Sequence, residues 1–416
     1  MNTKPLGLFE AFGVELEYMI VDRDTLRPLP LAEEILVNKK GATVNEFTLR
    51  GVGVSNELAA HVIEFKSAGP TDDLVRLERD FRAAIREINR KLAKRNAMLA
   101  PGGIHPFMDP TKESALWSKG NHSIYEAYDR IFNCHGHGWF NLQSCHLNLP
   151  FSNDDEFGRL HSAIILILPY LSALTASSPY MDGRHDGFLD TRLSVYSNNQ
   201  SKIPEIAGSI VPEAVFSRAT YEREILQKVY DAIAPLDPDG ILQHEWLNSR
   251  GAIPRFDRYA IEIRVLDTQE CPIRDIAICS FIIAVLETLC SRAPTELEAL
   301  AQRHTPEERR VQFMNVARYG RGAAIDLTDI GDAFGFGQSV VDVGDLWTHL
   351  LQVLQKSPRV RPYLDTLQQI LDEGSLAERM LAENGYEPSA ESLRDMVSDL
   401  AESLATNAPY RARADA

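Results

Sequence analysis

The stretch FGVELEYMIVD, Phe12–Asp22, places two carboxylates inside an otherwise apolar run. Side chains two residues apart lie on the same face of a β-strand, so Glu15 and Glu17 share one face while the apolar residues between them cover the other. Two carboxylates this close repel each other unless water or a cation separates them. The pattern therefore predicts either a solvated edge strand or a strand whose polar face holds a metal ion.

Three later segments repeat this division into an apolar and a polar face. The polar positions are Glu64, in a segment predicted as two short strands, 58–60 and 62–65, or one bent strand, His146 and Asn148 within 142–149, and Glu262 and Arg264 within 259–267. One such strand could be a solvated edge. Four of them predict an antiparallel sheet that packs one face on helices and turns the other into a polar cavity, which is an α+β fold.

Helical spacing of apolar residues recurs along the chain. A long helix should begin at Thr71, which can cap it, and keep one apolar face as far as Leu92. A buried helix over 163–176 should kink near Pro169, because proline breaks the hydrogen-bond ladder. Further helices are predicted near Tyr125–Phe132, over Ile276–Leu289, and from about Leu346 onward.

We predict a catalytic domain over residues 1–340 and a C-terminal helical extension over 341–416 that packs on it. The extension ends in NAPYRARADA, residues 407–416, which we expect to be mobile. The polar stretch 179–213 is longer than most connections and is a candidate substrate loop. GVGVSN at Gly51 and GDAFGFG at Gly331 lack the strand-then-helix context of a phosphate-binding loop and are predicted to be turns.

Composition limits the partners and the location. The net charge of -16 and the pI near 5.2 argue against binding of nucleic acid or an anionic membrane. Five cysteines form no CxxC pair and indicate reduced thiols. No basic segment followed by an apolar one marks a signal peptide at the amino terminus. We therefore expect a cytoplasmic protein that acts on small molecules, and a homo-oligomer is left open.

The polar strand faces favour a hard cation. Carboxylates and a neutral imidazole, without thiolates, are ligands that Mg²⁺ and Mn²⁺ prefer, and a cavity with several such ions suits a nucleoside triphosphate such as ATP. The cluster CHGH, Cys134–His137, offers too few ligands for a tetrahedral zinc site and has no second cluster to complete it. His105 in GGIHPF is predicted to bond to the backbone rather than to a metal.

The ordered set of motifs resembles glutamate–cysteine ligase family 2 and its carboxylate-amine ligase relatives. The set is FGVELEYMIVD, the IEF strand at Glu64, GGIHPF, CHLNLPF, GFLDTR and IEIRVLD, and it spans roughly residues 9–289. The resemblance implies a fold similar to glutamine synthetase, in which a curved antiparallel sheet forms a funnel with helices on its outer face. It also implies an enzyme that uses ATP to phosphorylate a carboxylate, usually the glutamate side chain, before an amine displaces phosphate to leave an amide.

Roles for single residues follow from the same resemblance. Asn148 would contact nucleotide or substrate, and Arg264 would neutralise charge on the transferring phosphoryl group and contact the nucleotide. Arg192 would hold the substrate carboxylate or the acyl phosphate. Magnesium, or manganese in its place, would be held by Glu15, Glu17, Glu57, Glu64, His146 and Glu262.

Several alternatives stay open at this point. Glu262 and Arg264 could pair on an exposed strand face, and Glu57 could be a solvated acid in a turn. The strand around His146 reads HLNLP where the family commonly has HVHVG, so the amine substrate is undetermined. A phosphotransferase acting on a guanidino group, or an inactive nucleotide-binding regulator, could use the same fold.

Overall fold

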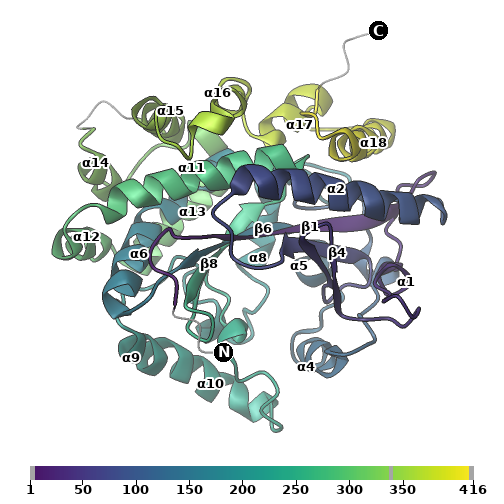
Figure 1. The fold of residues 1–416 in the computed structure, drawn as a ribbon, viewed down its shortest axis with the longest axis horizontal. Helices are drawn as coiled ribbons and strands as arrows, with labels where there is room; N and C mark the ends of the chain where they lie inside the picture. Colours follow the sequence, from purple (N-terminus) through teal and green to yellow (C-terminus); the bar gives the residue numbers. More distant parts are fainter. Residues whose placement is uncertain (1–4, 337–340, 412–416) are drawn as a thin grey trace.

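The predicted antiparallel sheet forms the centre of the structure (Figure 1). A computed structural model describes residues 5–336 and 341–411. The strand order is β2-β3-β4-β1-β6-β8-β7, with β5 paired to the end of β1, and every pairing is antiparallel. The strands are β1 Gly13–Asp22, β2 Glu46–Leu49, β3 Val52–Asn56, β4 Val62–Ser67, β5 Ala97–Ala100, β6 Ser144–Pro150, β7 Ala252–Arg255 and β8 Ala260–Asp267. The α+β prediction is confirmed.

The apolar face of the sheet packs on helices α2 (Leu74–Ala93), α6 (Asp154–Ile167) and α11 (Pro272–Cys290) (Figure 1). On β1 the core residues are those that alternate with the two carboxylates, and Leu16 and Tyr18 are fully buried among them. The predicted helix Ile276–Leu289 lies within α11. Burial of one complete strand face explains why the sequence alternates so strictly there.

Two predictions about helix ends have different outcomes. Asp73, not Thr71, caps α2, because its carboxylate accepts the hydrogen bond from Arg76 N at 2.9 Å, while the Thr71 backbone pairs with Phe12. Pro169 ends the regular helix as expected. After α6 the chain forms a 3-10 turn over Leu168–Tyr170 and a short helix α7, Ser172–Thr175.

The prediction that both glycine-rich segments form turns is wrong in part. GVGVSN forms the strand β3, whose valines are buried in the core, and only Arg50 and Gly51, with φ of 56° and 83°, make the turn before it. GDAFGFG begins inside helix α14, Asp329–Phe334, and Gly335 with φ of 71° caps the end of that helix. Its last glycine lies outside the described residues. Apolar burial overrode the turn preference of glycine at both places. Residues 58–60 are not a strand.

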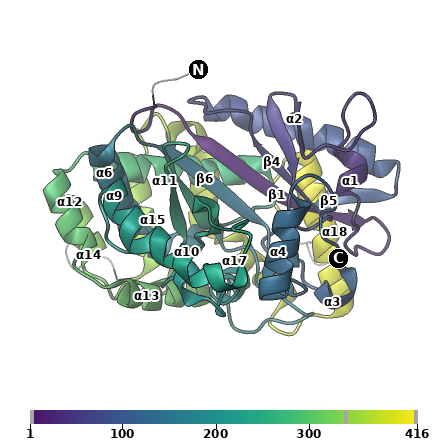
Figure 2. The same ribbon diagram turned by 90° about the horizontal axis from the view of Figure 1, so that it is seen from below.

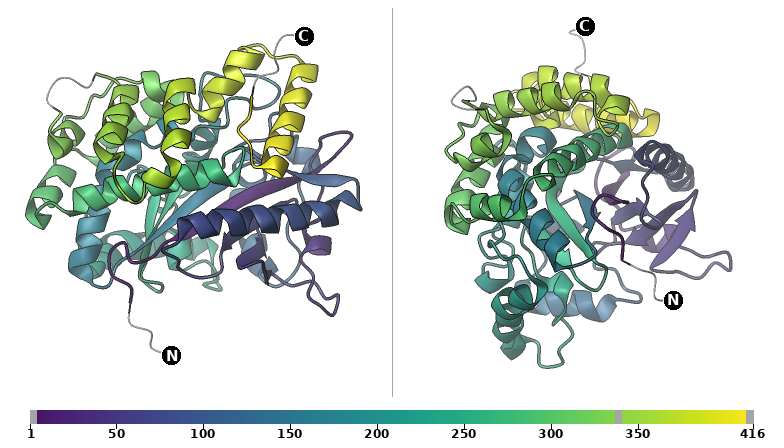
Figure 3. Two further views of the ribbon diagram at one scale, coloured as in Figure 1. Left: turned by 45° about the horizontal axis from the view of Figure 1, so that its top comes forward. Right: turned by 60° about the vertical axis from the view of Figure 1, so that its left-hand side comes forward.

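The C-terminal segment is helical, as the sequence predicts. Its helices lie side by side across α11 and α2 on the outer side of the molecule (Figure 3). The mobility expected for 407–416 is wrong for the start of this tail, because Asn407 bonds to Glu78 at 2.7 Å and Tyr410 is buried; residues 412–416 lie outside the described part. These helices are α15 Val343–Leu354, α16 Leu364–Glu373, α17 Leu376–Asn384 and α18 Ala390–Thr406.

Shorter helices lie on the opposite side of the sheet from α2 and α11 (Figures 1 and 2). The predicted helix Tyr125–Phe132 is part of α4, and the candidate substrate loop contains α8. No helix within 5–336 or 341–411 is long and apolar enough to cross a membrane. The helices on this side are α4 His122–Phe132, α5 His137–Phe140, α8 Thr191–Tyr196, α9 Arg218–Tyr221 and α10 Gln227–Ile233. The remaining α-helices are α1 Ala32–Ile35, α3 Pro110–Glu113, α12 Pro294–Ala301 and α13 Pro306–Tyr319.

Three buried histidines are held in the neutral form. Burial lowers the pKa of His61 and His161 to about 4 and that of His105 to about 3. Within the described residues the second ring nitrogen of each is buried without a hydrogen-bond partner. The first nitrogen contacts a backbone carbonyl oxygen: that of Phe140 at 2.7 Å for His61, that of Val215 at 2.8 Å for His161, and that of Leu26 at 2.9 Å for His105. The predicted backbone bond of His105 is confirmed.

These histidines should make the fold sensitive to acid. In the unfolded chain they gain a proton near pH 6.5, whereas in the folded chain they stay neutral until the pH nears 4. Their burial therefore lowers the free energy of unfolding very little above pH 6.5 and increasingly as the pH falls below it. At pH 5 each should cost about 2 kcal/mol. When the pH is lowered from 7.5 to 5, the free energy of unfolding in urea should fall by about 2 kcal/mol less in His161→Gln than in wild type. His135, which is half-exposed, provides the control: if His135→Gln reduces the pH dependence as much as His161→Gln does, this account is wrong.

Candidate functional site

A cavity of about 510 Å³ lies on the polar face of the sheet, between strands β1, β3, β4, β6 and β8 and helices α4, α5 and α8. Arg192 and Arg264 line it, whereas Asn148 is not among its lining residues in the described structure. The side chains that the sequence assigned to metal ions all line it: Glu15, Glu17, Glu57, Glu64, His146 and Glu262. The polar strand faces therefore converge on one cavity.

Strand register explains this convergence. Glu64 on β4 stands opposite Glu17 on β1, and Glu15 stands between Lys66 on β4 and His146 on β6. Cross-strand neighbours share a face of the sheet. A slip of one residue in either pairing would turn the whole polar row toward the helices, so burial of the apolar face fixes the site.

His146 connects the carboxylates of β1 and β8. Its Nδ1 lies 3.2 Å from Glu15 Oε2 and 3.7 Å from Glu262 Oε1, and its Nε2 lies 2.8 Å from Ser144 Oγ. Ser144 N and Oγ donate to Glu17 at 2.7 and 3.0 Å. Burial alone would lower the pKa of His146, but its bond to Glu15 and the charge of Glu262 raise it. The imidazole is thus held by acids on two sides.

Lys66 is a cavity residue that the sequence interpretation missed. Its Nζ lies 2.9 Å from Glu64 Oε2 and 3.0 Å from Glu46 Oε2, while Ser55 donates to Glu64 at 2.5 Å. Burial alone would lower the pKa of Lys66, but the charge of Glu64 raises it. The signal was present, because Lys66 follows Glu64 by two residues and so faces the same side.

The carboxylates of this region are not equivalent. Burial would raise the pKa of Glu15, but the bond and charge of His146 lower it to about 2. Burial and the charge of Glu15 raise the pKa of Glu64 to about 7. Burial and the charges of Glu64 and Glu17 hold the pKa of Glu57 well above its usual range. The acids thus carry more negative charge than the neighbouring cations balance, and a bound cation would relieve it.

The donor set fits a hard divalent cation. Glutamate oxygens and one imidazole are suitable ligands for Mg²⁺ or Mn²⁺. In the described residues no three His, Cys, Asp or Glu side chains already surround one common metal position. The carboxylates instead bond to His146, Ser144, Ser55 and Lys66. The chemistry of the wall therefore fits the metal, and binding would require these side chains to exchange partners.

Arg264 lies at a β-bulge. Between the pairs Cys145↔Leu266 and Leu147↔Ile263, strand β8 has one residue more than β6. Arg264 Nε lies 2.9 Å from Glu262 Oε1, and its side chain is 24% exposed, whereas that of Glu262 is 6% exposed. The pair is therefore enclosed in the cavity and not on an exposed strand face. Bulges commonly redirect side chains at active sites.

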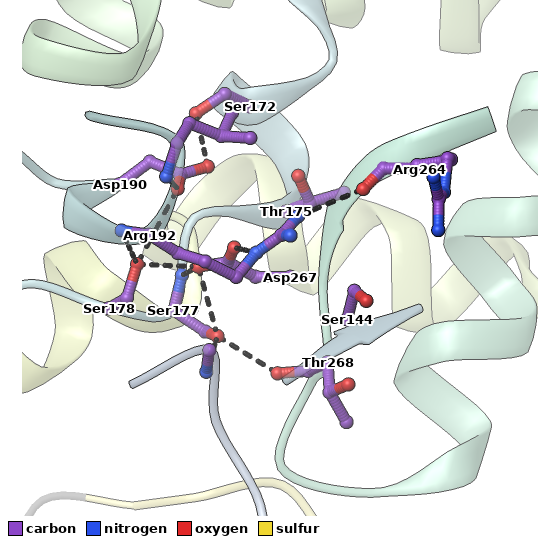
Figure 4. Close-up of polar contacts among 12 residues, drawn as sticks. Ser144, Ser172, Thr175, Ser177, Ser178, Asp190, Arg192, Arg264, Asp267 and Thr268 are labelled. Atoms are coloured by element: carbon purple, nitrogen blue, oxygen red, sulfur yellow. Dashed lines mark hydrogen bonds and ion pairs between the residues drawn. The ribbon is translucent and has the colours of Figure 1, made fainter. Parts of the chain in front are cut away.

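Arg192 is held by a buried acid that the sequence interpretation missed, Asp267 (Figure 4). Arg192 Nε donates to Asp267 Oδ1 at 2.5 Å, and its Nη2 donates to the carbonyl oxygen of Arg264 at 3.2 Å. Both side chains are almost fully buried. The predicted grip of Arg192 on a substrate stays a prediction, and what the geometry gives is an arginine fixed beside Arg264.

Asp267 is itself enclosed by polar groups (Figure 4). Its Oδ2 accepts from Ser178 Oγ at 2.7 Å and from Ser177 N at 2.9 Å. Gly103 of the GGIHPF motif donates its N–H to Ser177 Oγ at 2.9 Å, and a Cβ atom on Gly103 would lie 2.5 Å from Asp267 Oδ2. Only glycine permits this close approach. The motif therefore packs against the support of Arg192.

Two other sequence expectations have clear outcomes. Asn148 Nδ2 donates to Glu15 Oε1 at 3.1 Å, so it orients a cavity carboxylate, and its contact with nucleotide stays a prediction. In the CHGH cluster Cys134 is buried and His137 pairs with Asp182 at 3.0 Å. No group of three metal-ligating side chains gathers there in the described residues, and the absence of a zinc site stays a prediction.

One half of the cavity wall carried no recognisable motif. Arg255, the last residue of β7, and Arg258, in the turn that follows, line it, and so does an aromatic surface of Tyr128, Trp139 and Trp246. These aromatic residues come from distant segments, and β7 is too short to predict. Only the three-dimensional structure brings them together.

Comparison with protein families gives one match across most of the chain. The model of glutamate–cysteine ligase family 2 matches residues 11–399, which include most of the C-terminal helices. An uncharacterized protein from Archaeoglobus fulgidus is 34% identical over 96% of this chain and 99% of its own length. The "Putative glutamate–cysteine ligase 2" of Bdellovibrio bacteriovorus is 22% identical over 89% of this chain and 88% of its own.

Solved structures show the same fold at low identity. A glutamate–cysteine ligase from Francisella tularensis, in complex with AMP, is 13% identical with a TM-score of 0.57, over 98% of this chain and 95% of that one. A bifunctional glutathione synthetase from Pasteurella multocida is also 13% identical, with a TM-score of 0.59. This chain matches it over 95% of its own length but only 52% of the synthetase.

Proposed function

Because this chain belongs to glutamate–cysteine ligase family 2, we propose that it is an ATP-dependent ligase that joins a carboxylate, that of the glutamate side chain, to an amine. The observation that carries the proposal is the convergence of the acidic strand faces with His146, Arg264 and Arg192 in one cavity. The proposed use of ATP is also supported by the AMP complex of the Francisella ligase.

The reaction needs ATP because a carboxylate resists attack by an amine. It is anionic, and oxide would have to leave. Transfer of the terminal phosphoryl group of ATP to a carboxylate oxygen gives an acyl phosphate and ADP. The amine nitrogen then bonds to the carbonyl carbon, the carbon–oxygen bond to phosphate breaks, and one proton is released as the amide forms. Both steps require positioning and charge neutralisation more than covalent help.

The cavity residues suit these requirements. The glutamates and His146 would hold magnesium, which would supply positive charge against that of the phosphate groups. Arg264 presents a planar guanidinium that can meet a phosphoryl group with two hydrogen bonds. Arg192, fixed by Asp267, adds positive charge beside it for the glutamate carboxylate. Glu262 forms an ion pair with Arg264 and so favours its orientation toward the acid.

Hydroxylamine tests the proposed intermediate, because this strong nucleophile can replace the natural amine. The protein with ATP, magnesium and glutamate should convert hydroxylamine to a hydroxamate, detected as its ferric complex, with one ADP formed per hydroxamate. Excess chelator should abolish the product and manganese should restore it. Release of AMP and pyrophosphate would instead indicate an acyl adenylate, and ATP consumption with arginine or creatine-like compounds alone would indicate a kinase.

A further inference from the structure

The two edges of the sheet give the cavity two chemically different halves. The acidic half, Glu15, Glu17, Glu57, Glu64 and Lys66, lies on or next to β1, β3 and β4. At the other end of the strand order, β8 and β7 lead to Arg255 and Arg258, the last residue of β7 and a residue of the following turn. Opposite charges thus line different parts of one cavity.

Arg255 is a buried arginine with donors to spare. It is 8% exposed, and within the described residues its Nε forms no hydrogen bond. Its contacts with acids are long: Nη2 donates to Asp257 Oδ2 at 3.4 Å, Nε lies 3.4 Å from Asp257 Oδ1, and Nη1 lies 3.6 Å from Glu262 Oε2. A buried guanidinium normally has its donors satisfied, and two parallel bonds to a carboxylate would do so.

The aromatic surface lines the same cavity as this arginine. Ring centroids of Tyr128 lie 5.2 Å from Trp139 and 6.0 Å from Trp246, so the three rings form one continuous wall. Asp257 N donates to Glu245 Oε2 at 3.2 Å, which ties the segment of Trp246 to the turn that follows Arg255. Leu58, Ile124 and Leu142 extend the apolar lining. A large apolar group placed here would exclude water from several rings.

We propose that this half of the cavity binds the amine substrate, and that this substrate is an amino acid with a large apolar or aromatic side chain. Its α-carboxylate bonds to Arg255 and its side chain packs on Tyr128, Trp139 and Trp246. The inference rests on the proposed function. It names Arg255 as the residue that distinguishes an amino acid from a simple amine.

The position of Glu262 links this site to the reacting groups. Its Oε1 contacts Arg264 and its Oε2 contacts Arg255, so one carboxylate lies between the two guanidinium groups. The α-amine of an amino acid is one carbon from its carboxylate. A carboxylate held by Arg255 therefore keeps the amine near Arg264, where the acyl phosphate would form. This assignment leaves the acidic half for the nucleotide and its metal ions, which the carboxylates there would hold.

Phenylalanine and phenethylamine test the proposal, since they differ only in the carboxylate. With ATP and glutamate present, kcat/KM for phenylalanine should exceed that for phenethylamine at least about tenfold in wild type. In Arg255→Gln the two values should agree within about threefold, and Arg255→Lys, which keeps the charge, should retain part of the preference. Arg50→Gln, a surface arginine paired with Glu87, is the matched control and should keep the wild-type ratio.

Side-chain preference gives a second measurement. Wild type should favour phenylalanine over cysteine about tenfold or more, and Trp246→Ala should reduce that preference. Trp117 and Trp347 are fully buried, so the change in tryptophan emission on binding should come from Trp139 and Trp246. Phenylalanine, added with glutamate and a non-hydrolysable ATP analogue, should therefore alter the emission of wild type more than that of Trp246→Phe.

The outcomes separate this inference from the proposed function. Hydroxamate formation without any preference for phenylalanine over phenethylamine or cysteine would overturn the amine assignment alone. A raised KM for ATP or glutamate, and not for the amine, in Arg255→Gln would assign Arg255 to another substrate. Emission changes caused by ATP or AMP alone, and lost in Trp246→Phe, would place the adenine on the aromatic wall. No hydroxamate and no ATP consumption would overturn both proposals.

Discussion

Replacement of Arg264 by lysine is expected to lower kcat about 100- to 1000-fold while changing the affinity for ATP less than about threefold. Arg264 is charged whether or not substrate is present, and a lysine keeps that charge. What lysine lacks is the planar fork that can donate two hydrogen bonds to a phosphoryl group as charge develops on it. Single-turnover hydroxamate formation and ATP binding by calorimetry separate the two effects.

The structure defines the control for this substitution. Arg264 Nε lies 2.9 Å from Glu262, and its Nη1 donates to the carbonyl oxygen of Asn248 at 3.4 Å. A lysine could keep the ion pair with Glu262 but could not make both contacts. Arg50→Lys makes the same change at an exposed pair with Glu87 and should be inert. If Arg264→Lys abolishes ATP binding while the rate of the bound enzyme is unchanged, Arg264 anchors the ground state instead.

The polar strand faces could be predicted from the sequence because apolar and polar residues alternate with the two-residue period of a β-strand. Strict alternation on β1 separates Glu15 and Glu17 from the core residues, and the same alternation on β6 and β8 exposes His146 and Glu262 to the cavity. Antiparallel pairing then brings these faces together without further information. The position of Lys66 followed the same rule and could have been predicted.

Asp267 could not be predicted by that rule, because the rule fails at the bulge. Counting by two from Ile263 through Val265 places Asp267 on the core face. The extra residue in β8 instead makes Val265 and Leu266 consecutive core residues, and it turns Asp267 toward Arg192. One inserted residue thus creates the support of the second arginine, and no local pattern marks its position.

The aromatic wall was missed for a different reason. Tyr128, Trp139 and Trp246 lie on α4, α5 and a 3-10 turn, and nothing in their local spacing relates them. Each is also partly embedded in a satellite hydrophobic cluster, so its sequence context is that of a core residue. Long-range packing, which single-sequence patterns do not encode, makes these rings a cavity surface.

Glu57 distinguishes most sharply between a metal site and a solvated acid. In the sequence it could be either, and in the structure it lines the cavity, where burial and the charges of Glu64 and Glu17 raise its pKa well above the usual range. A carboxyl group with a raised pKa in the folded state destabilises the fold at every pH where it ionises above its unfolded pKa. Such a cost is tolerated where the charge serves a ligand.

Glu57→Gln should therefore make the metal-free protein more stable at pH 8 and less active. Glutamine has nearly the same volume but no charge to repel Glu64 and Glu17, so the midpoint of thermal unfolding in chelator should rise. With one carboxylate fewer, Mn²⁺ should bind more weakly, and hydroxamate formation should fall at least about 100-fold. Paramagnetic resonance of free Mn²⁺ measures the binding without reference to catalysis.

The stability difference should also depend on pH in a defined direction. The raised pKa means that folding makes Glu57 harder to ionise than it is in the unfolded chain. The stability advantage of the glutamine variant should therefore shrink as the pH falls toward 4.5, where the unfolded wild-type chain also gains this proton. Glu34→Gln, at an exposed pair with Arg95, is the matched control and should change neither stability nor Mn²⁺ binding. If Glu57 is a solvated acid, Glu57→Gln should behave like this control. If Glu57 is a metal ligand that costs the fold stability, Glu57→Gln should raise the unfolding temperature and lower the activity.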